Sequence, residues 1–152
     1  MLADFQQALA DLTASPELCI AVKIDPSLLM RRYDLTGREA GRLEAIVRHP
    51  GMACSCMVYR ANRLAPLALN TPGLCKALGR DLRAVASDYW AAHPQSNVHF
   101  YVEADRFCRF VRREIARGRR LAPEVRGVLE IESGEVAAAL RESHTEAAWR
   151  EV

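Results

Sequence analysis

The sequence of 152 residues has no long apolar run. Its longest apolar stretches, such as residues 64–69, are far short of the ~20 residues that a helix needs to cross a bilayer. The first residues, Met1–Gln7, lack the basic region and apolar core of a secretory signal peptide. These absences predict a cytoplasmic protein with no membrane partner.

Lysine is nearly absent as well, since the chain has only Lys23 and Lys76 but nineteen arginines. The net charge of +2 is too small by itself to indicate a nucleic-acid or membrane partner. Apolar residues make up 50% of the chain and charged residues 26%, which places it among globular proteins. A chain of this length can bury a sizeable core.

No motif of a known catalytic centre occurs in the sequence. It has no nucleophile elbow, phosphate-binding glycine loop, His-Glu-x-x-His motif or dinucleotide fingerprint. Asp88 and Glu103 look like isolated carboxylates, because neither has a pairing signature nearby. We therefore predict a binding protein with no catalytic residue, no metal site and no cofactor of its own.

Cysteines and histidines are the residues that could contradict this prediction. An odd number of cysteines on helical segments favours free, buried thiols: Cys19, Cys54, Cys56, Cys75 and Cys108. Cys54 and Cys56 resemble part of a metal motif, but a spacing of two on a helix rotates the side chains by ~200°, to opposite sides. A structural zinc site would also need four ligands.

The histidines leave a metal site open as a further hypothesis. His49, His93 and His99 could converge with Cys108, which would make the protein a small metalloenzyme. His49 and His93 directly precede prolines at expected helix ends, and such histidines are more often caps or surface residues.

Hydrophobic spacing predicts an all-α fold, a compact domain of about seven or eight short helices. Ser15-Pro16, Asp25-Pro26 and Thr71-Pro72 are typical helix starts, and Thr36 with Glu39 forms a capping box. Gly79 and Gly118 are expected helix ends. The helix over 52–70 should be kinked or restarted before Pro66, because proline cannot donate the internal hydrogen bond.

The C-terminal part is expected to differ from the rest. We expect residues 1–118 to form a helical body and residues 119–152 a helical arm packed on it, within a single domain. Ser133-Gly134 should weaken the last helix, since glycine costs about 1 kcal/mol relative to alanine. A short strand at Gly127–Ile131 is the alternative for this stretch.

The densest polar cluster lies on the otherwise apolar helix over 52–70, at Tyr59, Arg60, Asn62 and Arg63. Tyr59 and Arg63 are four residues apart and so share a helix face. The cluster could form a buried network that ties this helix to its neighbours, which we favour, or it could line a groove that binds a peptide.

Residues 106–120 contain seven arginines and one glutamate, whereas residues 121–152 contain seven glutamates and three arginines. Arg106, Arg109 and Arg113 should lie opposite the apolar stripe of their helix. This face could be solvated and covered by the acidic tail, could bind an acidic partner through paired guanidinium contacts, or could bind nucleic acid. Nucleic-acid binding is disfavoured because Phe107 and Phe110 are expected in the core rather than exposed for stacking.

A resemblance to a known protein family indicates which kind of partner the chain could bind. It rests on three segments in order, Val58–Arg63, Thr71–Gly79 and Tyr89–Pro94, followed by the aromatic-rich helix over 107–115. Across roughly residues 52–117 the chain resembles the helical partner proteins, including a "putative DNA-binding" domain, encoded beside multinuclear nonhaem iron-dependent oxidative enzymes. It looks closest to the partner of the 3-thiaglutamate type and also resembles the methanobactin partner.

This resemblance implies a non-catalytic subunit that forms a heterodimer with an iron-dependent enzyme acting on peptidyl cysteine. Such a subunit helps to bind the ribosomally made peptide substrate, and the iron lies in the partner enzyme. Tyr59, Arg60, Asn62 and Arg63 are then expected as an organising cluster, and Arg106, Arg109 and Arg113 as contacts. The alternative is a nucleic-acid-binding regulator that uses the arginine-rich face.

Overall fold

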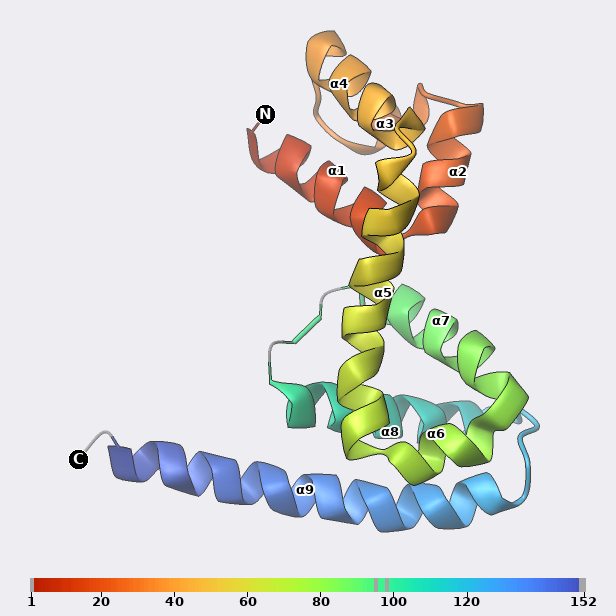
Figure 1. Ribbon diagram of the computed structural model, residues 1–152, viewed down its shortest axis with the longest axis vertical. Coiled ribbons are helices and arrows are strands. Elements are labelled where there is room, and N and C mark those ends of the chain that lie inside the picture. Colours follow the sequence, from red (N-terminus) through yellow and green to blue (C-terminus); the bar gives the residue numbers. More distant parts are fainter. Residues whose placement is uncertain (1, 95, 98, 151–152) are drawn as a thin grey trace. The chain divides into compact units, whose positions relative to one another are not determined.

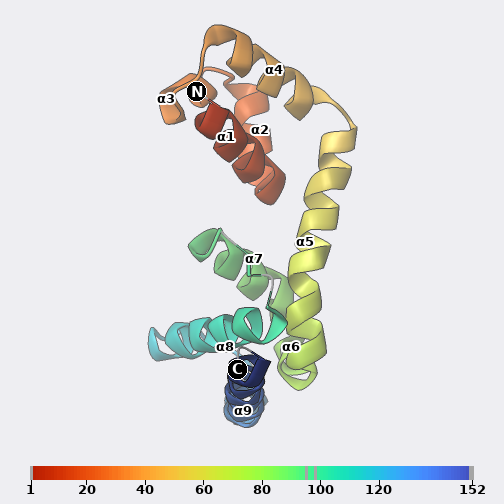
Figure 2. The same cartoon turned by 90° about the vertical axis from the view of Figure 1, so that its left-hand side faces the viewer.

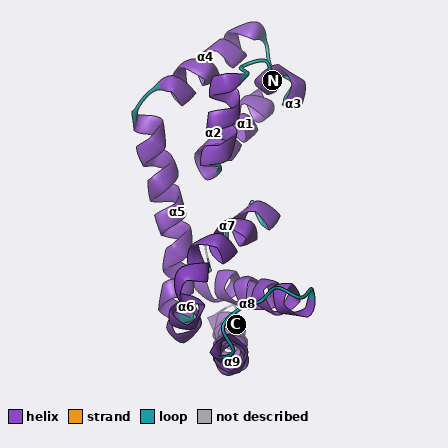
Figure 3. Cartoon of the chain, turned by 90° about the vertical axis from the view of Figure 1, so that its right-hand side faces the viewer, coloured by secondary structure: helices purple, strands orange, loops and turns teal. Residues whose placement is uncertain are grey.

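The computed structural model describes residues 2–94, 96–97 and 99–150, with side chains described as far as Ser143. Within this part the chain is all-α, as the hydrophobic spacing predicts, and Figure 3 shows only helices and loops there. The chain divides into two compact units, residues 1–62 and residues 63–152. The boundary expected near residue 118 lies inside the second unit, between two of its helices.

The first unit contains α1 (Leu2–Ala14), α2 (Pro16–Ile24), α3 (Leu28–Arg32), α4 (Gly37–Arg48) and the first part of α5 (Gly51–Asn70) (Figure 1). Two of its helix starts follow directly from the sequence. The Ser15 hydroxyl accepts a hydrogen bond from Leu18 N at 3.1 Å, and Thr36 forms the predicted capping box with Glu39.

The core of the first unit combines residues from all five helices. Its fully buried members include Leu12 of α1, Val22 of α2, Leu29 of α3 and Leu43 of α4, with Cys56 of α5 packed among them. The helices α1 to α4 have 13 residues or fewer and are marginal alone in water, so this shared core holds the unit together.

The second unit contains the end of α5, then α6 (Pro72–Leu78), a 3-10 turn η1 (Gly79–Asp81), α7 (Leu82–Ala92), α8 (Phe100–Ala116) and α9 (Glu124–Arg150). α8 packs against α9 and α7, and α9 also packs against α6 (Figure 2). The core is built around Tyr89 and Phe107, whose rings meet edge to face with centroids 5.3 Å apart.

Gly79 and Gly118 end their helices as predicted, with φ angles of +50° and +93° that favour glycine. α5 runs through Pro66 as one helix, so of the two expected alternatives, a kink or a restart, the restart does not occur. Proline removes the hydrogen bond to the carbonyl of Asn62, four residues earlier.

The strand considered at Gly127–Ile131 is wrong, since these residues lie within α9. Val125, Leu129 and Val136 are buried at helical spacing on the side of α9 that faces the core, and this spacing outweighs the local cost of the glycines. No helix in the described part of the chain is both long and apolar enough to cross a membrane.

Candidate functional site

The predicted polar cluster on α5 is divided between the two units. Arg60 belongs to the first unit and Arg63 to the second. Tyr59 is half-buried and Asn62 is exposed, so Asn62 does not share the buried face of Arg63. Arg60 and Arg63 of this cluster therefore take part in separate polar contacts, which we describe in turn.

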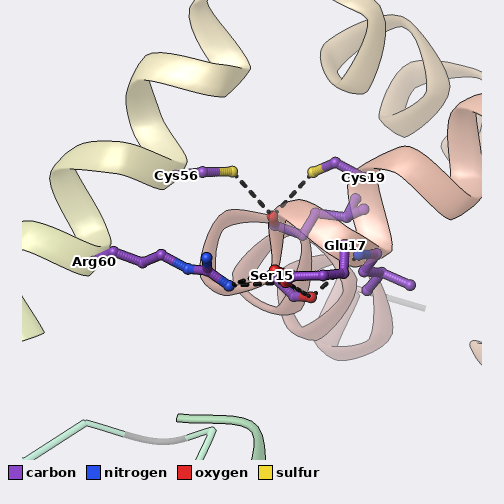
Figure 4. A network of polar contacts seen from close by, with 7 residues as sticks. Ser15, Glu17, Cys19, Cys56 and Arg60 are labelled. Atoms are coloured by element: carbon purple, nitrogen blue, oxygen red, sulfur yellow. Dashed lines mark hydrogen bonds and ion pairs between the residues drawn. The ribbon is translucent and has the colours of Figure 1, made fainter. Parts of the chain in front are cut away.

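In the first unit, Arg60 binds Glu17 at the start of α2. Its Nη2 atom donates to Glu17 Oε1 at 2.9 Å and to Oε2 at 2.8 Å (Figure 4). The Ser15 hydroxyl donates to the same carboxylate at 3.1 Å. Burial opposes ionisation of Glu17, but these hydrogen bonds and its own backbone N–H outweigh it and lower the pKa of the carboxyl.

One turn earlier on α5, Cys56 points toward Cys19 of α2. Both thiols donate to the carbonyl oxygen of Leu12, at 3.1 Å from Cys19 Sγ and 3.4 Å from Cys56 Sγ (Figure 4). That carbonyl lies four residues before Pro16, which has no N–H to offer it. The two thiols thus satisfy a buried acceptor that the proline leaves without its helical donor.

This arrangement keeps the Cys19 thiol protonated. Burial and the neighbouring Cys56 raise the pKa of Cys19 to about 12. A thiolate would also face the carbonyl oxygen with negative charge. Both thiols therefore act as hydrogen-bond donors, and Cys19 does not have the low pKa of a reactive nucleophile.

In the second unit, Arg63 forms a buried ion pair with Glu103 of α8, with 2.8 Å between Nη2 and Oε1. The side chains are only 3% and 1% exposed. Arg63 Nη1 also donates to the carbonyl of Pro94 at 3.4 Å, and Glu103 Oε2 accepts from Asn97 N at 3.2 Å. The pair therefore links α5 and α8 to the loop before α8.

Tyr89 of α7 completes this network. The Arg63 guanidinium carbon lies 5.7 Å from the centre of its ring, and its hydroxyl donates to the Glu103 carbonyl at 3.4 Å. Burial, together with the nearby Glu103, raises the pKa of Tyr89. These contacts form a buried network around Arg63, one member of the cluster for which the sequence favours such a role.

The interpretation of Asp88 and Glu103 as isolated carboxylates is wrong. Glu103 pairs with Arg63, and Asp88 accepts a hydrogen bond from Arg119 at 2.7 Å. The partners are 40 and 31 residues away along the chain, beyond the reach of any local spacing rule. An apolar stripe on α8 that includes one glutamate is the only signal that could have suggested a buried role for Glu103.

The arginine face of α8, defined by Arg106, Arg109 and Arg113, is exposed as predicted. Arg109 pairs with Asp105 on the same helix at 2.8 Å. No ion pair joins Arg106 or Arg113 to another residue in the described part of the chain. This face therefore presents two unpaired guanidinium groups, seven residues apart on one side of α8.

The acidic C-terminal helix α9 pairs with Arg112, which lies beside the arginine face on α8, and not with the arginine face itself. Arg112 donates to Glu130 of α9 from Nε at 3.0 Å and from Nη2 at 2.9 Å. Hydrogen bonding to Arg112, opposed by burial, lowers the pKa of Glu130. Phe107 and Phe110 are buried as expected, so no stacking aromatic from this part of α8 lies on the arginine face.

The histidines lie at helix ends. His49 Nδ1 accepts from Gly51 N at 3.1 Å, and His93 packs on the Tyr89 ring with centroids 4.9 Å apart. His99 precedes the first residue of α8. Among residues 2–94, 96–97 and 99–150, no group of three or more potential metal ligands comes together.

Cys54 is exposed and Cys56 is buried, which confirms that they point to opposite sides of α5.

Comparisons of the chain with protein-family models, with curated proteins and with solved structures found no match.

Proposed function

We propose that this protein is a non-catalytic partner subunit that binds an acidic surface through the arginine face of α8. The supporting observation is that Arg106 and Arg113 are exposed and have no carboxylate partner among the described residues, whereas neighbouring Arg112 and Arg119 are paired. Guanidinium groups bind carboxylates through two parallel hydrogen bonds, and such contacts give specificity as well as affinity.

The resemblance over residues 52–117 is the basis for the partner that we propose. This partner is an iron-dependent oxidative enzyme that modifies cysteines of a ribosomally made peptide, and the iron centre belongs to that enzyme. The present chain forms a heterodimer with it and helps to hold the peptide. The two polar contacts of α5 then serve to stabilise the units, and the α8 face makes the contact.

Co-expression with an iron-dependent oxidative enzyme of the resembled type, followed by size exclusion, tests the proposal. The Arg106→Glu, Arg113→Glu double variant should elute apart from the enzyme, and the enzyme should lose activity on its peptide. An Arg80→Glu, Arg83→Glu variant is the matched control, because it changes the net charge equally at two exposed arginines of the same unit. Equal co-elution of both variants would contradict the role of α8.

The second candidate is a nucleic-acid-binding regulator, which the same two unpaired arginines favour. Binding through phosphate contacts weakens steeply as salt rises. A titration of the chain with duplex and single-stranded DNA at two salt concentrations distinguishes the candidates. Salt-sensitive binding that the double variant abolishes, without any co-elution with the enzyme, would favour the regulator.

A further inference from the structure

Two of the four arginines within α8 are neutralised by carboxylates, and two are not. Arg106 and Arg113 are exposed, and neither forms an ion pair in the part of the chain that the structure describes. The other two are paired at 2.8 Å and 2.9 Å, Arg109 with Asp105 and Arg112 with Glu130. The outward side of α8 therefore has two separate positive charges with the paired Arg109 between them.

The arginine face belongs to a longer row of residues along the outward side of α8. We call it the α8 row, and it consists of Val102, Arg106, Arg109, Arg113 and Ala116. The spacing of these residues alternates between four and three, which is the pattern along which a second helix packs. All five are exposed or half-buried, and the buried residues of α8 lie on its opposite side. The row therefore favours a partner segment that follows the axis of α8.

The distance between the two unpaired charges distinguishes a helical partner from an extended one. Seven residues of helix rise about 10.5 Å, which is the separation of Arg106 and Arg113 along the axis. Carboxylates seven residues apart on a partner helix have the same separation and lie on one side of that helix. An extended segment rises about 3.3 Å per residue and alternates its sides, so its carboxylates on one side lie about 6.6 Å or about 13 Å apart. Neither of these values matches.

We infer that the partner of the arginine face is an acidic helix that lies along α8 and carries two carboxylates seven residues apart. This inference rests on the proposed function and names the form of its acidic surface. Each carboxylate accepts parallel hydrogen bonds from one guanidinium group, that of Arg106 or that of Arg113. The partner residue midway between the carboxylates is uncharged, because Arg109 already binds Asp105.

NMR spectroscopy of the isotope-labelled full chain tests the inference, because it detects weak binding at individual arginine side chains. Exposed ion pairs are individually weak, so an isolated peptide should bind with low affinity. The probe is an alanine-rich helical peptide of about 20 residues, with blocked termini and two glutamates seven residues apart as its only charges. The Nε–H signals of Arg106 and Arg113 should shift as the probe is added.

A second peptide tests the spacing. It has the same composition, but its glutamates are five residues apart and so lie about 140° from each other around the helix. Only one of them can reach an arginine at a time, and the peptide should bind at least about threefold more weakly than the probe.

A charge exchange separates this geometry from general attraction between opposite charges. The Arg106→Glu, Arg113→Glu variant should lose the probe, and it should bind a peptide with two arginines in place of the glutamates. The Arg80→Glu, Arg83→Glu variant is the matched control and should bind the probe like the original chain, because both of these arginines lie outside the α8 row.

Three results would overturn the inference: equal affinity for the two acidic peptides, shifts confined to arginines outside the α8 row, or no binding of either peptide. The proposed function would survive them if the enzyme still co-elutes with the original chain and not with the double variant, since the contact would then be an acidic surface of another form. Binding of the probe without co-elution of the enzyme would keep the acidic helix and remove the iron enzyme as its source.

Discussion

The carboxylate of Glu132 on α9 caps the start of α6, with Oε1 at 2.7 Å from the backbone N of Gly73. Its other oxygen accepts from Leu74 N, also at 2.7 Å. The expected cap residue, Thr71, uses its hydroxyl on the Leu67 carbonyl instead. A side chain from a distant helix thus satisfies the free N–H groups of α6 and fixes α9 against it.

A Cβ at position 73 would lie 2.8 Å from Glu132 Oε1. We expect Gly73→Ala to lower the free energy of unfolding by about 1–2 kcal/mol, because the carboxylate must move away from its donors. Urea denaturation followed by circular dichroism measures this. Gly127→Ala is the control, since its Cβ meets open space, and it should stabilise α9 by up to about 1 kcal/mol. An equal effect of both variants would contradict the cap.

The ion pair between Arg63 and Glu103 predicts a large cost when only one partner is removed. Arg63→Met should destabilise the protein by about 3–5 kcal/mol, because it leaves a buried charge without a partner. Adding Glu103→Gln to this variant should recover part of the loss. Arg109→Met breaks an exposed pair and should change stability by less than about 1 kcal/mol. Thermal unfolding of these three variants and the original chain measures the losses, and a double variant less stable than Arg63→Met would argue against coupling.

Cys19 predicts a loss of stability at alkaline pH. Its pKa rises from 9.0 to about 12 in the folded chain, so its contribution is complete below pH 9 and disappears as the pH rises through 12. Cys19→Ser retains a donor for the Leu12 carbonyl but does not titrate in this range. The free energy of unfolding, measured between pH 7 and alkaline pH, should therefore fall less in the variant than in the original chain. Identical slopes would show that Cys19 has an ordinary pKa.

Burial also predicts an order of thiol reactivity. Cys54 is exposed and should react first with iodoacetamide, followed by the half-buried Cys75. The other cysteines should react slowly, since they are buried, and burial raises the pKa of Cys108 to about 12. Peptide mapping by mass spectrometry gives the order, and all five should react alike in denaturant. Early labelling of Cys56 in the native chain would contradict the buried thiol pair.

Much of the local structure could be predicted because it depends on residues within four positions of one another. The Ser15 cap, the capping box of Thr36 and the glycine ends at Gly79 and Gly118 are of this kind. The exposure of Cys54 and the burial of Cys56 follow from helical geometry alone. The strand alternative at Gly127–Ile131 arose where two glycines weaken a helix whose stability comes from packing.

The candidate site could be predicted only in part. Sequence spacing placed Arg106, Arg109 and Arg113 on one exposed face. It could not show that Arg109 pairs with Asp105 while Arg113 has no ion pair in the described part of the chain. The partner of Arg63 was missed for the same reason, because Glu103 is brought to it by the packing of another helix.

The sequence by itself determined that this protein is helical and where most of its helices begin and end. These properties depend on short-range hydrogen bonds and on the 3.6-residue period. Only the tertiary structure decided that both arginines of α5 point inward and that Glu132 caps α6. An ion pair forms only when packing brings two distant charges within about 3 Å, and no local pattern encodes that approach.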